Sequence, residues 1–147
     1  MCGGIQYTDS ANKTWKVYFP SPKAALPILK KDGEIEWVKW GKRKEEDSNE
    51  MPENKFFAPG GWARLDSINE GKWKRFHPVP VKIPVQSFME KDAQKESHWI
   101  DVPVGKVIQG LLAVHDDQAR VYVVTTDTPE EFAWVHDRWP RLVDIQP

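Results

Sequence analysis

The sequence predicts an α+β fold that is predominantly β, in one domain spanning residues 1–147. Short runs rich in β-branched and aromatic residues recur along the chain, separated by glycine, proline or charged residues. Helix signals are few. With 147 residues and 39% hydrophobic side chains, the chain is long enough to bury one core, and it shows no internal repeat.

Six runs have the composition of β-strands. They are KVYF (16–19), IEWVKW (35–40), VPVKIPV (79–85), WIDVPV (99–104), VIQGLLAV (107–114) and ARVYVVTT (119–126). The segment HDDQAR at 115–120 separates the last two runs and suits a hairpin connection. A sheet built from neighbouring strands is therefore expected in the second half of the chain.

Two short helices and one long loop complete the expected elements. The segment SPKAALPILKK (21–31) predicts a short helix broken by Pro27. The segment TPEEFAWVHDRW (128–139) predicts another, because Thr128 can cap it, Pro129 suits its first position and two glutamates follow. Residues 41–61 lack periodicity and are expected to form a long loop.

Composition and charge limit the possible cellular location and partners of the protein. The net charge is −1, but the basic excess lies in residues 1–82, with 15 Lys and Arg against 11 Asp and Glu. No apolar run approaches the ~20 residues of a membrane helix, and no signal segment opens the chain. The single cysteine cannot form an internal disulfide, and the four histidines lack metal-site spacing. We expect a cytoplasmic monomer without metal, cofactor or membrane partner.

Two stretches in the basic half alternate aromatic and cationic residues, WVKWGKRK at 37–44 and KWKRF at 72–76. Aromatic faces stack on bases and cations follow phosphates, so this alternation suits single-stranded nucleic acid. The alternative is a solvated face whose tryptophans point into the core. The candidate DNA-binding residues in the two stretches are Trp40, Lys42, Arg43, Trp73, Lys74 and Arg75.

Cys2 is the only cysteine and stands one residue from the start of the chain. It could be a buried apolar residue, an ordinary nucleophile, or a residue whose own α-amine becomes free when Met1 is removed. Glu90, beside Phe88 and Met89, is either an acid/base with a raised pKa or an exposed strand-end glutamate. His136 is either catalytic or a histidine that ends a helix.

Five segments resemble, in the same order, motifs of the SOS-response-associated peptidase (SRAP) family. They are MCGG (1–4), WG (40–41), WARLD (62–66), KIPVQSFMEK (82–91) and VVTTDTPEEFAWVHDRWPRLV (123–143). The chain resembles a short and divergent member. Trp62 stands where the family usually has asparagine, Gly4 where it has arginine, and Lys91 where it has tryptophan.

The resemblance implies a compact, barrel-like sheet and a covalent reaction with abasic sites in single-stranded DNA. The α-amine of Cys2 would form an imine with the sugar aldehyde, and the thiol would then close a thiazolidine ring. By the same resemblance, Glu90 is the acid/base, His136 assists at the adduct, Arg64 holds a phosphate and Trp62 stacks on a base.

Three alternatives stay open beside this hypothesis. The MCG start also occurs in N-terminal-nucleophile glutamine amidotransferases, in which the thiol attacks an amide. A protein of the SRAP type could also bind DNA without crosslinking it. The family name further implies a self-processing peptidase, although only one methionine precedes Cys2 in this sequence.

Overall fold

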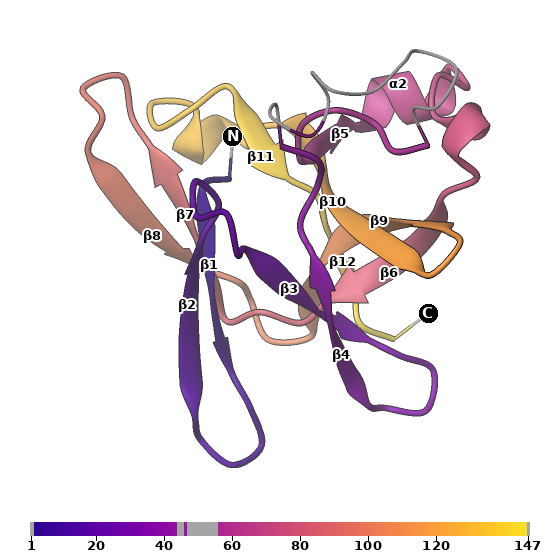
Figure 1. The fold of residues 1–147 in the computed structure, drawn as a ribbon. Helices are drawn as coiled ribbons and strands as arrows, with labels where there is room; N and C mark the ends of the chain where they lie inside the picture. The colour runs from indigo at the N-terminus through magenta and orange to yellow at the C-terminus, as the bar shows by residue number, and fades with distance from the viewer. Residues whose placement is uncertain (1, 44–45, 47–55, 147) are drawn as a thin grey trace.

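The structure is a computed structural model that describes residues 2–43, 46 and 56–146. It confirms a predominantly β fold, with two sheets and short helical segments (Figure 1). The described helical segments are α2 (Leu65–Asn69) and the 3₁₀ turns η2 (Lys74–Phe76) and η3 (Glu130–Phe132). No helix among the described residues is long and apolar enough to cross a membrane.

The first sheet is antiparallel and contains the N-terminal strand. Its order is β2 (Thr14–Tyr18), β1 (Gly4–Thr8), β7 (Ser87–Lys91) and β8 (Ser97–Asp101). Residues at the start of the chain thus lie beside residues about 85 positions later, with Gly4 opposite Met89. This pairing brings the segment after Met1 next to Glu90.

The second sheet has eight strands. Its main path is β11 (Arg138–Pro140), β10 (Gln118–Asp127), β9 (Lys106–His115), β6 (Val79–Ile83), β3 (Ala25–Leu29) and β4 (Ile35–Lys39). Beside that path, β12 (Leu142–Asp144) pairs with β9, and β5 (Trp62–Arg64) runs parallel to β10. A single bridge from Trp40 to Val121 brings the end of β4 to β10, but the sheet does not close, so the expected barrel is only approximate.

The helix expected at 21–31 is wrong, because Ala25–Leu29 forms strand β3 between β4 and β6. Pro27 cannot donate a helical hydrogen bond. Strand β3 accommodates it because the pairing with β6 is at Leu29, away from Pro27, and Leu26 and Ile28 are buried there. The helix expected at 128–139 shrinks to η3, and Arg138–Pro140 forms a strand paired with β10.

The hairpin expected between the last two long runs is confirmed, since β9 and β10 pair from Gln118 opposite His115 onward. Of the loop expected at 41–61, residues 44–45 and 47–55 lie outside the described residues. Lys42 pairs with Gly60, so the described ends of this segment lie side by side.

Hydrophobic side chains from both sheets share one core, in which Ile5 and Phe88 join Leu26, Ile108 and Val121. A second cluster around Tyr122 lies under α2 and η2 and includes Trp73 and Phe76. The candidate cavity borders the first of these two cores.

Candidate functional site

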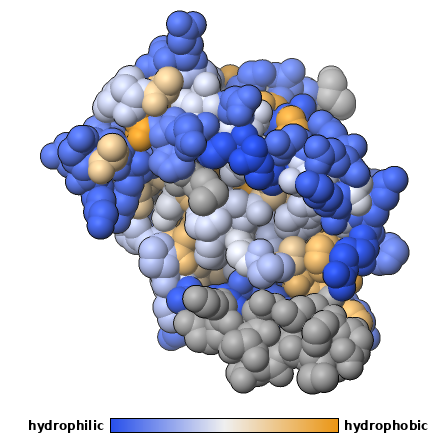
Figure 2. Space-filling model, turned by 90° about the horizontal axis from the view of Figure 1, so that it is seen from above, coloured by the Kyte–Doolittle hydropathy of each residue, from blue (hydrophilic) through white to orange (hydrophobic). Residues whose placement is uncertain are grey.

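A cavity of about 810 Å³ opens beside the start of β1. The first sheet, the segment after β4, strand β5 and the segment before β11 all contribute to it. The lining residues are Gly3, Tyr18, Phe19, Pro20, Trp40, Lys42, Arg43, Pro59, Gly60, Trp62, Met89, Lys91, Asp92 and His136. Figure 2 shows the molecule from the end at which the N-terminus lies, where hydrophilic residues surround paler, less polar ones.

Cys2 lies directly behind this cavity. Its neighbour Gly3 lines the wall, and the Trp62 indole Nε1 donates a hydrogen bond of 2.9 Å to the Cys2 carbonyl. The thiol is fully buried and donates to the Gly4 carbonyl over 3.3 Å. Burial raises the pKa of the Cys2 thiol, and the charge of Glu90 raises it further. These surroundings favour the protonated thiol over the thiolate.

Glu90 is also fully buried, so it is not the exposed strand-end glutamate of the alternative interpretation. It lies on β7 opposite His98, with the cavity-lining residues Met89 and Lys91 on either side in sequence. Burial raises the pKa of Glu90 to about 7. Near neutral pH its carboxyl group can therefore either give or accept a proton.

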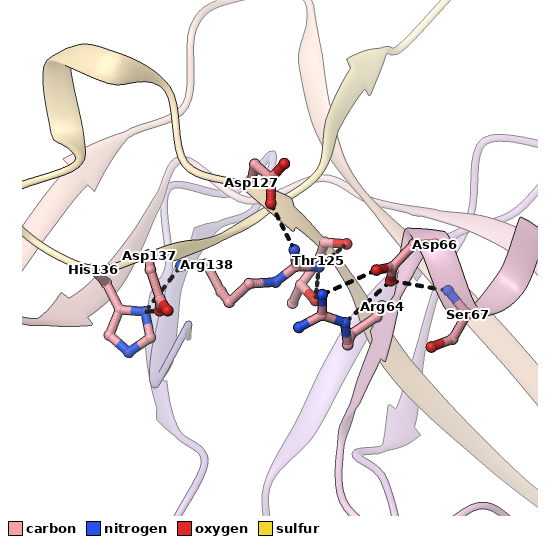
Figure 3. A network of polar contacts seen from close by, with 8 residues as sticks. All are labelled: Arg64, Asp66, Ser67, Thr125, Asp127, His136, Asp137 and Arg138. Carbon is pink, nitrogen blue, oxygen red and sulfur yellow. Dashed lines mark hydrogen bonds and ion pairs between the residues drawn. The ribbon is translucent and has the colours of Figure 1, made fainter.

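His136 lines the cavity and does not end a helix, because the chain after η3 is irregular until β11 begins. Its Nδ1 accepts a hydrogen bond of 3.1 Å from the Arg138 backbone N–H (Figure 3). Burial lowers the pKa of His136, against the opposing effect of Asp137, whose Oδ1 lies 3.1 Å from Nδ1. Because the neutral ring accepts at Nδ1, its proton is on Nε2.

Arg64 is not among the residues that line the cavity. Its guanidinium forms a double hydrogen bond with Asp66, at 3.1 and 3.0 Å, and the side chain is exposed (Figure 3). These hydrogen bonds lower the pKa of Asp66 to about 2. A phosphate at Arg64 must therefore share the guanidinium with a permanently charged carboxylate.

The two aromatic residues at the cavity differ in exposure. Trp40 belongs to the core: its Nε1 donates to the Gly61 carbonyl over 2.9 Å, and its ring stacks on Phe19 at 4.6 Å. Trp62 is only half-buried and packs against Trp40 edge to face, with ring centroids 5.1 Å apart. Trp40 thus supports the wall, whereas Trp62 presents aromatic surface to the cavity.

The two basic stretches lie in different places. Lys42 and Arg43 line the cavity, where Lys42 is buried and Arg43 donates to the Pro20 carbonyl over 3.1 Å. In the other stretch, Trp73 packs on Tyr122 in the second core, with ring centroids 5.0 Å apart, while Lys74 and Arg75 are exposed. None of these last three residues lines the cavity, so the stretches do not form one groove there.

Sequence reasoning missed several lining residues, among them Tyr18, Phe19 and Met89. An alternating strand pattern could have indicated Tyr18, since it lies on the exposed face of β2. It also missed that Asp92, Glu96 and His98 hold possible metal-ligand atoms within 4.8 Å of one another. The Asp92 carboxylate accepts hydrogen bonds from two backbone N–H groups of the turn and contacts His98 Nε2 at 2.7 Å. These contacts account for the position of the Asp92 side chain.

No family model matches this chain, and a search of curated proteins gave no match.

Proposed function

We propose that this protein binds single-stranded DNA at the cavity and forms a thiazolidine crosslink with abasic sites through Cys2, as the SRAP resemblance implies. The observation that supports it best is the position of Cys2. Its backbone lies behind the wall of a large cavity, held by Trp62, and a buried glutamate lies close enough to raise the pKa of its thiol. We also propose that the protein is a monomer and acts in the cytoplasm.

The chemistry begins with the amine. Removal of Met1 leaves a primary α-amine on Cys2, which condenses with the ring-opened sugar aldehyde to give an imine and one water. The thiol then adds across the C=N bond, so that sulfur bonds to the former aldehyde carbon and the thiol proton moves to nitrogen. Only an N-terminal cysteine holds both groups at this spacing, which makes the ring closure intramolecular.

Glu90 has the ionisation needed for these proton transfers. With a pKa of about 7 it protonates the leaving oxygen in one step and accepts a proton in another, without leaving its buried position. The neutral His136 supplies a second donor, Nε2–H, on the cavity wall. Arg43 and Lys91 add accessible positive charge for the DNA backbone, the buried Lys42 adds charge within the wall, and Asp92 is the acidic residue on the same lining.

A thiolate nucleophile of the amidotransferase type fits these surroundings less well. In such an enzyme the α-amine takes the thiol proton as the sulfur attacks the amide, and burial, which raises the pKa of the Cys2 thiol, opposes that proton transfer. In the thiazolidine route the attack of sulfur is intramolecular and follows imine formation, and the thiol proton passes to the imine nitrogen as the C–S bond forms.

The test is to mix the protein with single-stranded DNA carrying one abasic site and to measure the intact mass. The expected adduct is the chain without Met1 plus the DNA, minus one water, and it survives denaturation. Cys2→Ala should give no such adduct, although its α-amine should still yield an imine that borohydride traps. Undamaged DNA of the same sequence is the control.

A stable adduct formed by Cys2→Ala at the wild-type level would rule out the thiazolidine. Glutamine hydrolysis that needs Cys2, without any DNA adduct, would support the amidotransferase alternative. Tight DNA binding without an adduct would support the non-crosslinking alternative.

A further inference from the structure

Tyr18, Gly4, Met89 and Trp99 lie in one row across the first sheet. Gly4 is paired with both Tyr18 and Met89, and Met89 is paired with Trp99. Directly paired residues project from the same face of a sheet. The rings of Tyr18 and Trp99 meet across the row, with centroids 6.1 Å apart and planes at 80°. We call these two rings and the Met89 beneath them the outer row.

The outer row depends on the absence of a side chain at Gly4. A Cβ there would lie 2.8 Å from the Val17 carbonyl oxygen and 3.6 Å from the Tyr18 ring. Without it, the Tyr18 ring reaches across β1 to Trp99, and Met89 is left only 4% exposed. The two rings themselves remain 46% and 36% exposed, so the row presents aromatic surface to solvent.

The outer row continues from the cavity and is flanked by cations. Tyr18 and Met89 also line the cavity, as does Lys91, the next residue of β7 on the same face. On the other side is Lys16, two residues before Tyr18 on β2, with its Nζ 5.3 Å from the Trp99 ring centroid. The acidic residue Asp101 follows Trp99 by two residues on β8 and lies on the same face, so the lysines face one carboxylate at this end of the row.

We propose that the outer row is a second stacking site, which holds a base of single-stranded DNA that runs from the cavity across the first sheet. This inference rests on the proposed DNA-binding function. Exposed aromatic rings with lysines on both sides match alternating bases and phosphates. An incoming base takes the place of the Lys16 ammonium on the Trp99 ring, and that ammonium then pairs with the adjacent phosphate.

The experiment compares binding of two undamaged oligothymidines, about 5 and about 15 nucleotides long, by fluorescence anisotropy. Trp99→Ala should weaken binding of the longer one by about 5- to 100-fold and change the shorter one much less. Trp99→Phe, which keeps a ring, should recover most of the affinity. Lys16→Ala should lower the salt dependence of the longer oligonucleotide by about one counterion.

The matched control is Trp37→Ala, because Trp37 is 39% exposed but belongs to a different aromatic cluster, with Tyr7 and Trp15. Equal affinity of wild type and Trp99→Ala for both oligonucleotides would overturn the inference. So would a wild-type dimer that Trp99→Ala converts to a monomer without loss of DNA affinity, since the row would then be a self-association surface.

Failure of the proposed function gives a different result. A wild-type protein that binds the longer oligonucleotide through Trp99 but forms no adduct with an abasic site would contradict the crosslinking proposal. The same result would support the outer row as a DNA-binding site. A wild-type protein that binds neither oligonucleotide would overturn the outer row together with the DNA-binding proposal.

Discussion

Replacing Glu90 by glutamine tests whether burial raises the pKa of its carboxyl group. The pKa of Glu90 rises from 4.5 to about 7 in the folded protein. The folded state therefore binds the proton more tightly than the unfolded chain does. The resulting stabilisation is complete below about pH 4.5 and is lost as the pH rises through about 7. A shift of this size corresponds to about 3 kcal/mol.

Glutamine has nearly the same shape and no ionisation, so Glu90→Gln should lack this loss. We expect the free energy of unfolding of the wild type, relative to the variant, to fall by about 3 kcal/mol between pH 4 and pH 8. Urea unfolding of both proteins across this range measures the difference. The control is Glu36→Gln, because Glu36 is exposed on β4 and its replacement should leave the pH dependence unchanged. Parallel curves for wild type and Glu90→Gln would refute the reasoning.

Three further predictions concern the reaction and the DNA. Glu90→Gln should slow adduct formation by about 100-fold with nearly unchanged DNA affinity; a wild-type rate from pH 5 to 8 would exclude it as the acid/base. Arg64→Ala should weaken binding of single-stranded DNA and lower its salt dependence by about one counterion. Asp66→Asn should strengthen binding, because it frees the Arg64 guanidinium for a phosphate. Unchanged affinity of both variants in a salt titration would exclude a phosphate contact at Arg64. His136→Ala should impair formation or reversal of the adduct, and His136→Asn, which keeps an acceptor for the Arg138 N–H, separates this effect from instability in thermal unfolding.

The sequence predicted the long antiparallel strands because the runs VIQGLLAV and ARVYVVTT are rich in apolar and β-branched residues and are separated by a charged turn. It predicted a helix at 21–31 because lysines and alanines flank the apolar residues, while the partners of β3 come from β4 and β6. Strand β1 was missed although Ile5, Tyr7 and Thr8 favour strands, because so short a run is identified as a strand by its pairing with β2 and β7. Pairing with strands that are distant in the sequence therefore determined these elements more than local propensity did.

The candidate site shows the same limit at the level of single side chains. Sequence motifs indicated Cys2, Glu90 and His136. His136 lines the cavity, whereas Cys2 and Glu90 are buried beside the lining residues Gly3, Met89 and Lys91. The alternation of aromatic and basic residues did not reveal which tryptophans face solvent. Trp40 and Trp73 are held by packing in two different cores. Trp40 and Trp62 both line the cavity, but only Trp62 of these two is half-buried rather than buried. Nor did the sequence reveal that the Asp66 carboxylate accepts two hydrogen bonds from the Arg64 guanidinium.

Burial acts in opposite directions on the two candidate proton-transfer groups. It raises the pKa of Glu90 to about 7 and lowers the pKa of His136, so burial shifts both groups toward their uncharged forms. An uncharged Glu90 does not hold the Cys2 amine in its protonated, unreactive form, as a carboxylate beside it would. Since an imine forms only from the free amine, Glu90 favours the first step of the proposed reaction when it is protonated. It assists the later steps when it ionises. The same burial keeps the thiol protonated, which fits a reaction in which nitrogen attacks first and sulfur second.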